Sequence, residues 1–231
     1  MGPALADAMA RRGADIGLSY RQTAGGLERA AREVAALGRR VHLLRADLSV
    51  ADECARIVDE TARVFGRLDV LIHMASRYES KGFDQLTADD WDRGLAVDAR
   101  AAFLCAHAAA GHMRAAGDGR IILFSDWLPA SGRPRYPGYL TYYVAKATVI
   151  ALTEALALEL APDRILVNAL APGPIRPPAE LDAAEVVDVE KATPLGRWGG
   201  DQEVVQAVLS LIEADFITGE TIRVDGGRHI R

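Results

Sequence analysis

The chain has 231 residues, half of them hydrophobic, and a formal net charge of −5 at pH 7. This length suffices for one sizeable core and no linker-like stretch divides it, so we expect a single domain over residues 1–231, without a nucleic-acid or acidic-membrane surface. Two scattered cysteines, with no signal peptide and no membrane-spanning run, predict a cytoplasmic protein.

Helical and strand-like patterns alternate along the chain. The expected elements are helices over 3–12, 27–37, 51–65, 91–116, 142–160 and 204–213, and strands over 14–20, 41–44, 70–72, 120–124, 165–169 and 221–224. Glycines close the first three helices, at Gly13, Gly38 and Gly66. Alternation of this kind predicts parallel βαβ units in a doubly wound α/β sheet, which binds ligands at the carboxyl ends of its strands.

Tyr142 and Lys146 lie four residues apart in a helical pattern, and therefore on one face of that helix. An ammonium group beside a phenol favours the phenolate, so we expect Lys146 to lower the pKa of Tyr142. Such a pair can exchange the proton of a reaction that also moves a hydride. The spacing alone also fits an exposed Tyr and Lys, but the long apolar run and the strand that follow favour the functional interpretation.

Several motifs together resemble the short-chain dehydrogenases/reductases over nearly the whole chain. Besides YxxxK at Tyr142–Lys146, residues 165–175 resemble the family's RVNxxxPGxI segment, and residues 217–227 resemble its ITGxxxxVDGG ending. The resemblance implies a Rossmann-like fold, hydride transfer with a nicotinamide cofactor, a small-molecule substrate and a homotetramer. It assigns to the cofactor site Tyr142, Lys146, Pro172, Gly173 and Ile175, and it sets Asp98 at the position of the Asn in the family's proton relay.

The N-terminus departs from this resemblance. A dinucleotide fold opens with a strand and a Gly-rich turn whose amides meet the pyrophosphate at a helix N-terminus. Here a helix pattern starts almost at once, and Gly2 falls at the last glycine of the family's TGxxxGxG loop. We therefore expect the first strand and most of the Gly-rich loop to be missing. Either an N-terminal part is truncated or dinucleotide binding has been lost, and the complete downstream site favours truncation.

Arg21 follows the strand pattern at 14–20, where an acid would bind the ribose 2′-OH of NAD and an Arg the 2′-phosphate of NADP. No acid stands there, so NADP(H) is the expected cofactor, although solvated arginines at strand ends are common. By resemblance, Asp47 and Leu48 match the family's adenine-contacting pair, with an N-terminal cap as the alternative for Asp47. Ala75 and Ser76 belong to the segment that reads NNAG in the family, and are expected at the cofactor.

Asp126 stands where the family has its catalytic serine, and Ser125 comes one position early, facing the opposite side of a strand. The family's serine donates to a carbonyl oxygen, whereas an ionised Asp only accepts. An anion there would also keep the proton on Tyr142, in opposition to Lys146. These properties favour an imine-like bond in a nitrogen heterocycle over a simple ketone. The alternative is that Asp126 is a helix cap or turn former.

The same substitution resembles one subgroup, the pteridine reductases and the related dihydromonapterin/dihydrofolate reductases. This resemblance implies that Tyr78 sandwiches a pterin against the nicotinamide, with Asp126 and Tyr142 also at the substrate. The Pro- and Gly-rich stretch from Asp126 to Tyr142 is longer than in the subgroup, and we expect a loop there. The prediction is NADPH-dependent reduction of a pterin-like substrate with Tyr142 as proton donor. The alternatives are a 3-oxoacyl or other ketone reductase, and a catalytically inactive structural or regulatory protein.

The remaining candidates have structural interpretations. His73 lies on a strand pattern and is expected to be a core histidine, and no cluster of residues has metal-ligand spacing. Trp127 and Trp198 are expected to line the pocket or its lid. That lid, over residues 176–200, is expected to set the substrate specificity.

Overall fold

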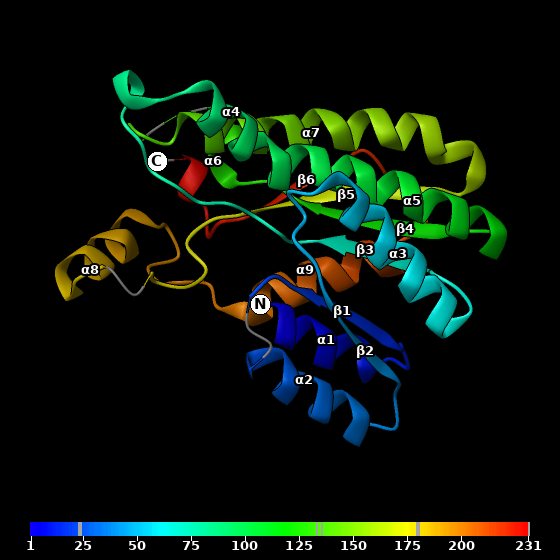
Figure 1. Cartoon of the computed structure of the whole chain (residues 1–231). Helices are drawn as coiled ribbons and strands as arrows, with labels where there is room; N and C mark the ends of the chain where they lie inside the picture. Colours follow the sequence, from blue (N-terminus) through cyan, green and yellow to red (C-terminus); the bar gives the residue numbers. More distant parts are fainter. Residues whose placement is uncertain (23–24, 133, 135, 179–180, 231) are drawn as a thin grey trace.

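Helices cover both sides of a set of parallel strands in the computed structural model (Figure 1). The structure describes residues 1–22, 25–132, 134, 136–178 and 181–230. The strands are β1 (Ile16–Tyr20), β2 (Val41–Arg45), β3 (Val70–His73), β4 (Gly119–Phe124), β5 (Ile165–Pro172) and β6 (Thr221–Val224). The helices are α1 (Gly2–Ala10), α2 (Gly25–Ala36), α3 (Ala51–Phe65), α4 (Ala88–Leu95), α5 (Ala101–Ala116), α6 (Trp127–Ala130), α7 (Leu140–Leu160), α8 (Ala183–Ala192) and α9 (Asp201–Glu213).

The strands form two sheets. β1 pairs with β2, and β3 to β6 form a second sheet in the order β3-β4-β5-β6, with every pair parallel. Helices α1, α2 and α9 lie on one side, and α3, α5 and α7 on the other (Figure 1). The predicted α/β fold with parallel strands is confirmed, and it brings the carboxyl ends of all strands to one edge.

The expectation at the N-terminus is not supported. The chain forms α1, β1 and α2 within its first 36 residues, so a strand and two helices stand near its start. The predicted helix 3–12 is α1, and the predicted strand 14–20 is β1. The strands form two separate sheets, because no described residue of β1 pairs with β3.

The predicted helix over 91–116 differs from the structure in two ways. It begins earlier, at Ala88, because Thr87 and Asp90 form a capping box in which each side chain binds the backbone N–H of the other residue. It is also interrupted, since Ala96–Arg100 forms a π-helical turn between α4 and α5. Single π turns often occur at functional sites, and this one carries Asp98.

Two segments for which no helix was predicted contain one each. The stretch between Asp126 and Tyr142 includes α6, whose first turn is capped by the Asp126 carboxylate. The predicted lid over 176–200 includes α8, which Asp182 and Glu185 begin with a second capping box. The prolines and glycines between Asp126 and Tyr142 predicted a loop, although Asp126 also fitted a helix cap.

The buried core has three parts. One lies between the β3–β6 sheet and α3, α5 and α7, and a second lies on the other side of that sheet, against α1 and α9. A small third cluster around Ala6, Ala10 and Val34 joins α1 and α2 to β1. No helix among the described residues is both long and apolar enough to cross a membrane.

Candidate active site

Four of the predicted site residues meet beside the carboxyl end of β4. Asp126 follows β4, Tyr142 and Lys146 come from successive turns of α7, and Asp98 comes from the π turn before α5. Helix α7 can lie against the sheet along its length because it is apolar over most of its circumference, with Ala145 and Val149 buried. The i, i+4 spacing then turns Tyr142 and Lys146 toward the same strand ends.

Asp126 has two partners. Its Oδ2 accepts a hydrogen bond from the Tyr142 hydroxyl at 3.0 Å, and its Oδ1 accepts one from the backbone N–H of Leu128 at 2.8 Å. The cap interpretation of Asp126 is therefore correct, and so is its expected proximity to Tyr142. Burial raises the pKa of the Asp126 carboxyl, while the two hydrogen bonds and Lys146 act in the opposite direction.

The pKa of Tyr142 moves the other way from the prediction. Burial raises it most, followed by the negative charge and hydrogen bond of Asp126. The expected lowering by Lys146 is wrong, because the Lys146 ammonium lies 5.8 Å from the centre of the Tyr142 ring and binds other groups. Tyr142 therefore stays protonated, as the reasoning from an anion at position 126 anticipated.

Lys146 is held in a buried ion pair. Its Nζ lies 2.8 Å from Oδ1 of Asp98 and donates a hydrogen bond of 2.8 Å to the carbonyl oxygen of Phe124. The Lys146 side chain is 3% exposed and that of Asp98 is fully buried, so neither charge is screened by water. Asp98 also accepts a hydrogen bond from the backbone N–H of Arg77 at 2.9 Å, which ties the segment after β3 to the same centre.

Ser125 and His73 complete the buried surroundings without facing the site. The Ser125 hydroxyl donates to the carbonyl oxygen of Lys146 at 2.8 Å, in agreement with its predicted orientation away from the ligand side. His73 is 5% exposed and its Nε2 lies 3.1 Å from the carbonyl oxygen of Val97. Burial lowers the pKa of His73 to about 4, so this is the neutral core histidine that the sequence predicted.

Two tyrosines form an aromatic wall beside Tyr142. The rings of Tyr78 and Tyr139 stack with centroids 4.6 Å apart, and the Tyr78 ring meets Tyr142 edge-on at 4.8 Å. Tyr78 is 59% exposed, which leaves its outer face open to a ligand. Tyr139 is not among the predicted site residues, although its position three residues before Tyr142 is a helical neighbour spacing that could have identified it.

Arg21 and Asp47, which are both predicted to bind the cofactor, line a separate hollow. This hollow of about 540 Å³ is lined by Arg21, Gln22, Arg45, Ala46, Asp47 and Glu53. The Arg21 side chain makes neither a hydrogen bond nor an ion pair with any described residue. The Asp47 carboxylate accepts hydrogen bonds from Ser49, at 2.9 Å from N and 2.7 Å from Oγ, and these lower its pKa. Asp47 is thus a turn former and not the cap of α3, which begins after Val50.

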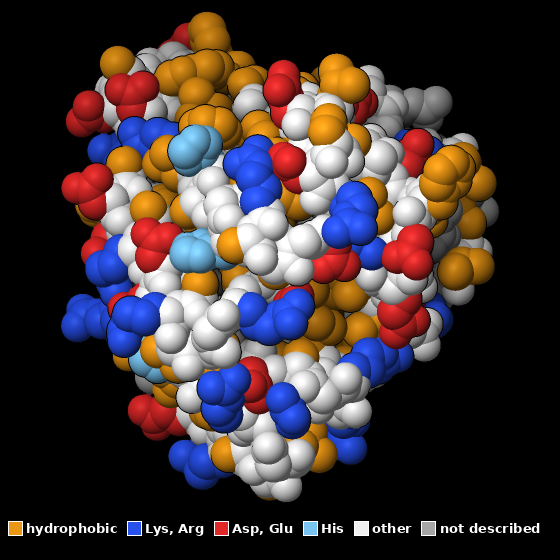
Figure 2. Space-filling model, turned by 90° about the vertical axis from the view of Figure 1, so that its right-hand side faces the viewer, with side chains coloured by type: hydrophobic (Ala, Val, Ile, Leu, Met, Phe, Trp, Pro, Cys, Tyr) orange, Lys and Arg blue, Asp and Glu red, His pale blue; other side chains and the backbone are white. Residues whose placement is uncertain are grey.

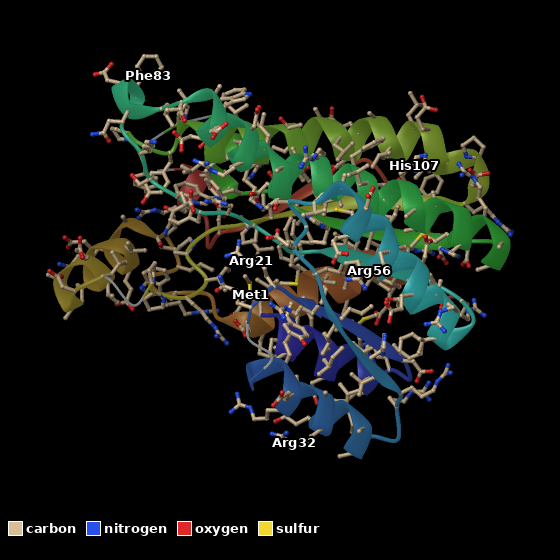
Figure 3. All side chains as sticks on the ribbon, in the orientation of Figure 1. Met1, Arg21, Arg32, Arg56, Phe83 and His107 are labelled. Atoms are coloured by element: carbon tan, nitrogen blue, oxygen red, sulfur yellow. The ribbon has the colours of Figure 1, made fainter. Side chains whose placement is uncertain are left out.

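The other predicted cofactor residues are spread along the strand ends. Pro172 ends β5, and Gly173 follows it so close to Asp225 that a Cβ atom would lie 2.5 Å from the Asp225 Cβ. Ile175 is buried, Leu48 packs against the larger core, and Ala75 and Ser76 follow β3. Gly2 opens α1 and lines a different groove, between the two sheets. In the view of Figure 3, Arg21 and Met1 both lie near the middle of the molecule, on the side where β1 ends.

The predicted lid has one ion pair to α9 and one hydrogen bond within itself. Arg176 forms an ion pair with Asp201 at the start of α9, and the indole N–H of Trp198 donates to the carbonyl oxygen of Val186 at 3.3 Å. Trp127 is buried under the Arg228 guanidinium, which lies 5.9 Å from its ring centre. Arg231 of the C-terminal motif lies outside the described residues. Across the part of the chain that is described, no three His, Cys, Asp or Glu side chains gather as a metal site.

The charges on the surface are mixed. On the face drawn in Figure 2, Lys and Arg side chains lie among Asp and Glu side chains, and neither sign forms a continuous field. A nucleic-acid surface would need a basic stripe or patch. This face offers none.

Comparison with known proteins adds four findings to this geometry. A family model described as enoyl-(acyl carrier protein) reductase matches residues 1–229. The uncharacterized oxidoreductase YohF of Escherichia coli is 35% identical, over 95% of this chain and 87% of its own length. A 3-oxoacyl-[acyl-carrier-protein] reductase of Synechocystis is 31% identical, over 98% of this chain and 90% of its own. Among solved structures, acetoin dehydrogenase from Enterobacter cloacae superposes with a TM-score of 0.89 at 34% identity, covering 100% of this chain and 93% of that one.

Proposed function

The chain belongs to the short-chain dehydrogenase/reductase family, and from that premise we propose that it reduces a ketone to a secondary alcohol with NADPH. One observation carries the direction of the reaction. The Tyr142 hydroxyl is buried against the Asp126 carboxylate at 3.0 Å, and both burial and that charge raise its pKa. A tyrosine that holds its proton is suited to donate it to a newly formed alkoxide.

Each residue of the site would have a separate role in this reduction. A bound nicotinamide would supply the hydride to the carbonyl carbon, and Tyr142 would give its proton to the carbonyl oxygen, so that C=O becomes CH–OH. Lys146, paired with Asp98 at 2.8 Å, keeps a positive charge near the tyrosine as the phenolate forms. Asp126 keeps the proton on Tyr142 until the alkoxide forms, because its carboxylate accepts the Tyr142 hydrogen bond and raises the pKa of that hydroxyl.

Three features fit a nicotinamide cofactor. The hollow of about 540 Å³ beyond β1 and β2 carries the guanidinium groups of Arg21 and Arg45. Gly173 lets the chain after β5 pass close to Asp225, and Lys146 lies at the same strand edge. We propose NADP(H) over NAD(H), since a basic pair faces the place where an acid would bind the ribose of NAD.

A ketone is favoured over a pterin as the substrate. The relatives reported above are named for acetoin and for 3-oxoacyl groups, both of which carry a ketone. The exposed ring of Tyr78 would then form an apolar wall beside the carbonyl carbon. Specific substrates differ in the groups that flank the carbonyl, and the residues of the 176–200 lid would select among them.

A pterin-like heterocycle is the second candidate, because one observation favours it. Asp126 supplies a carboxylate where a carbonyl reductase of this family uses a hydroxyl donor, and a carboxylate accepts the N–H groups that a pterin presents. Tyr78, with one ring face open, offers a stacking surface for such a ring. Asp126→Ser tests this candidate.

The experiment is an NADPH-oxidation screen with acetoin, a 3-oxoacyl thioester and dihydrobiopterin, with Tyr142→Phe as the inactive control. The same screen on Asp126→Ser and Asp126→Asn separates the two candidates, since Ser, Asn and Asp all cap helices well and α6 should persist. For a ketone reductase, Asp126→Ser keeps or raises ketone turnover. If the wild-type protein reduces only the pterin and Asp126→Ser loses that activity, the ketone proposal is wrong.

A further inference from the structure

The Asp126 carboxylate holds a charge that no described cation neutralises by contact. Its oxygens accept hydrogen bonds from neutral groups, the Tyr142 hydroxyl at 3.0 Å and the Leu128 N–H at 2.8 Å. Among the residues that the structure describes, no Lys or Arg forms an ion pair with it. Burial raises the pKa of this carboxyl, because water solvates the ionised form poorly here. A buried charge without a counter-ion is unfavourable, so a bound cation would stabilise the ionised carboxylate.

The nearest cation, Lys146, is already occupied. Its Nζ lies 2.8 Å from Oδ1 of Asp98 and donates to the carbonyl oxygen of Phe124 at 2.8 Å. Lys146 and Asp98 therefore cancel each other, and the charge of Asp126 remains. Two carboxylates and one ammonium give the centre an excess of one negative charge. Such a centre favours a positively charged ligand over a neutral or negative one.

Aromatic rings border the same carboxylate. The Tyr78 ring stacks on Tyr139 with centroids 4.6 Å apart, and it meets Tyr142 edge-on at 4.8 Å. Burial raises the pKa of the Tyr78 hydroxyl most, followed by Tyr139 and then by the charge of Asp126, so that charge acts on this ring. Tyr78 and Tyr136 are both exposed and keep surface for a ligand. The face of a tyrosine ring attracts a cation that lies within about 6 Å of its centre.

The two segments that carry these rings are fixed to each other. The backbone N–H of Lys81, after Tyr78, donates to the carbonyl oxygen of Gly138, before Tyr139, at 2.7 Å. The Lys81 ammonium also lies 2.5 Å from Oδ2 of Asp90 on α4. The rings therefore stand beside the carboxylate before a ligand arrives, and such preorganisation strengthens binding.

We propose that the substrate is an amino ketone, with a positively charged nitrogen on the carbon next to the carbonyl. This inference rests on the proposed ketone reduction and names the class of ketone. The Tyr142 hydroxyl and Oδ2 of Asp126 are 3.0 Å apart, so an oxygen beside the first and a nitrogen beside the second are carried by adjacent carbons. Bound NADPH gives its hydride to the carbonyl carbon and Tyr142 gives its proton to the oxygen. The product is an amino alcohol, and the nitrogen is unchanged.

The positive nitrogen also supplies what Asp126 lacks. An ionised carboxylate only accepts hydrogen bonds, so Asp126 by itself would repel the alkoxide that forms from the ketone. A cation on the adjacent carbon neutralises this repulsion and stabilises the developing negative charge of the oxygen. The alkyl groups of a substituted ammonium would lie on the exposed face of Tyr78.

The test compares two ketones of the same shape, acetonyltrimethylammonium and neopentyl methyl ketone. They differ only in a quaternary nitrogen in place of a quaternary carbon. Their binding to the whole 231-residue chain is measured by calorimetry, with and without saturating NADP⁺, which cannot donate a hydride. The cation should bind about tenfold more tightly or better. Since this readout needs no turnover, its failure is distinct from failure of the proposed reductase activity.

Three variants locate the preference for the cation. Asp126→Asn removes the charge and still caps α6, so the preference should fall to about threefold, the share of the rings. Tyr78→Leu keeps an apolar side chain and should weaken binding of the cation alone. Glu79→Gln is the matched control, because this neighbouring carboxylate pairs with Arg77 at 2.8 Å and should not contribute.

The proposal is supported if Asp126→Asn and Tyr78→Leu both reduce the preference and Glu79→Gln does not. It is overturned if the neutral ketone binds the wild type as tightly as the cation does, or if neither binds measurably. An unchanged preference in Asp126→Asn, or an equal loss in Glu79→Gln, also overturns it. If Asp126→Asn does not fold, Tyr78→Leu decides in its place, because the exposed Tyr78 lies outside the core.

Discussion

The two sheets differ in how deeply their strands are buried. In the β3–β6 sheet, Ile121, Ile122 and Leu123 of β4 are fully buried, as are Val167 and Ala169 of β5. In the β1–β2 sheet, no residue of β1 is fully buried, and β2 buries only Leu44. A two-stranded sheet alone has little stability, so this part of the fold depends on α1 and α2 and on the contact of α1 with α9.

The residues proposed for proton transfer and those proposed for cofactor binding lie on different sheets. The residues proposed for proton transfer stand on α7, the π turn and the end of β4, which move only if the larger core is disturbed. The basic residues proposed for the cofactor stand on the end of the smaller sheet, where Arg21 is exposed. We therefore expect substitutions in the larger sheet to affect stability and turnover, and substitutions in the smaller sheet to affect cofactor affinity alone.

The largest effect is expected for Asp98→Ala. It leaves the Lys146 ammonium buried without its carboxylate, and breaking a buried pair in this way costs about 3–5 kcal/mol. Urea unfolding followed by tryptophan fluorescence measures this loss, because Trp91, Trp127 and Trp198 all lie outside the β1–β2 sheet. Asp98→Asn is the matched control, since its amide oxygen can still accept from the Arg77 N–H. Equal stability of Asp98→Ala and the wild type would show that the pair does not hold the larger core together.

The next effect concerns turnover. Tyr142→Phe removes the proton donor and should lower kcat about a hundredfold or more, while its unfolding midpoint in urea stays close to that of the wild type. Its affinity for NADPH, measured by calorimetry, should also be little changed if the two tasks are separate. Near-normal kcat on the preferred substrate would remove Tyr142 from the proposed mechanism.

A smaller effect is expected in the other sheet. If Arg21 binds a 2′-phosphate, Arg21→Ala should weaken NADPH binding by about 1.5–3 kcal/mol and NADH binding far less. Arg32→Ala on α2 is the control, since this arginine is also exposed and Figure 3 labels it away from Arg21. Unfolding stability and kcat at saturating NADPH should be unaffected in both variants. Equal loss of affinity for NADPH and NADH would make Arg21 an ordinary surface residue.

Much of this arrangement could be predicted from local sequence patterns. The helix at 51–65 and the strand at 221–224 match the structure at both ends, because Gly66 takes a positive φ of 83° and ends the helix, and turns bound the strand. Tyr142, Lys146 and Asp126 could be brought together from helix spacing and strand order alone. Residues close together in the sequence determine these features.

What could not be predicted depends on residues distant in sequence. The pKa of Tyr142 was expected to fall because Lys146 is near in sequence, but Asp98 and the Phe124 carbonyl bind that ammonium from other elements. The π turn that delivers Asp98 has no composition signal of its own. The pairing of Tyr78 with Tyr139 depends on the backbone contact between Lys81 and Gly138, whose N–H···O distance is 2.7 Å. Such contacts follow from the assembled fold.

The last prediction concerns pH and the boundary between the two sheets, where His73 ends β3. Its pKa is lowered from 6.5 to about 4 by burial, so the native state keeps it neutral while the unfolded chain takes up a proton below pH 6.5. The stabilisation is therefore complete above pH 6.5 and is lost as the pH falls toward 4. At pH 5 the loss should be about 2 kcal/mol of unfolding free energy relative to pH 7. His73→Asn, which cannot titrate, should lose about 2 kcal/mol less over this interval in urea unfolding, whereas His107→Asn on the exposed side of α5 should behave as the wild type. If His73→Asn and the wild type lose the same stability, then β3 opens to water at this pH, and the boundary of the larger core lies at β4.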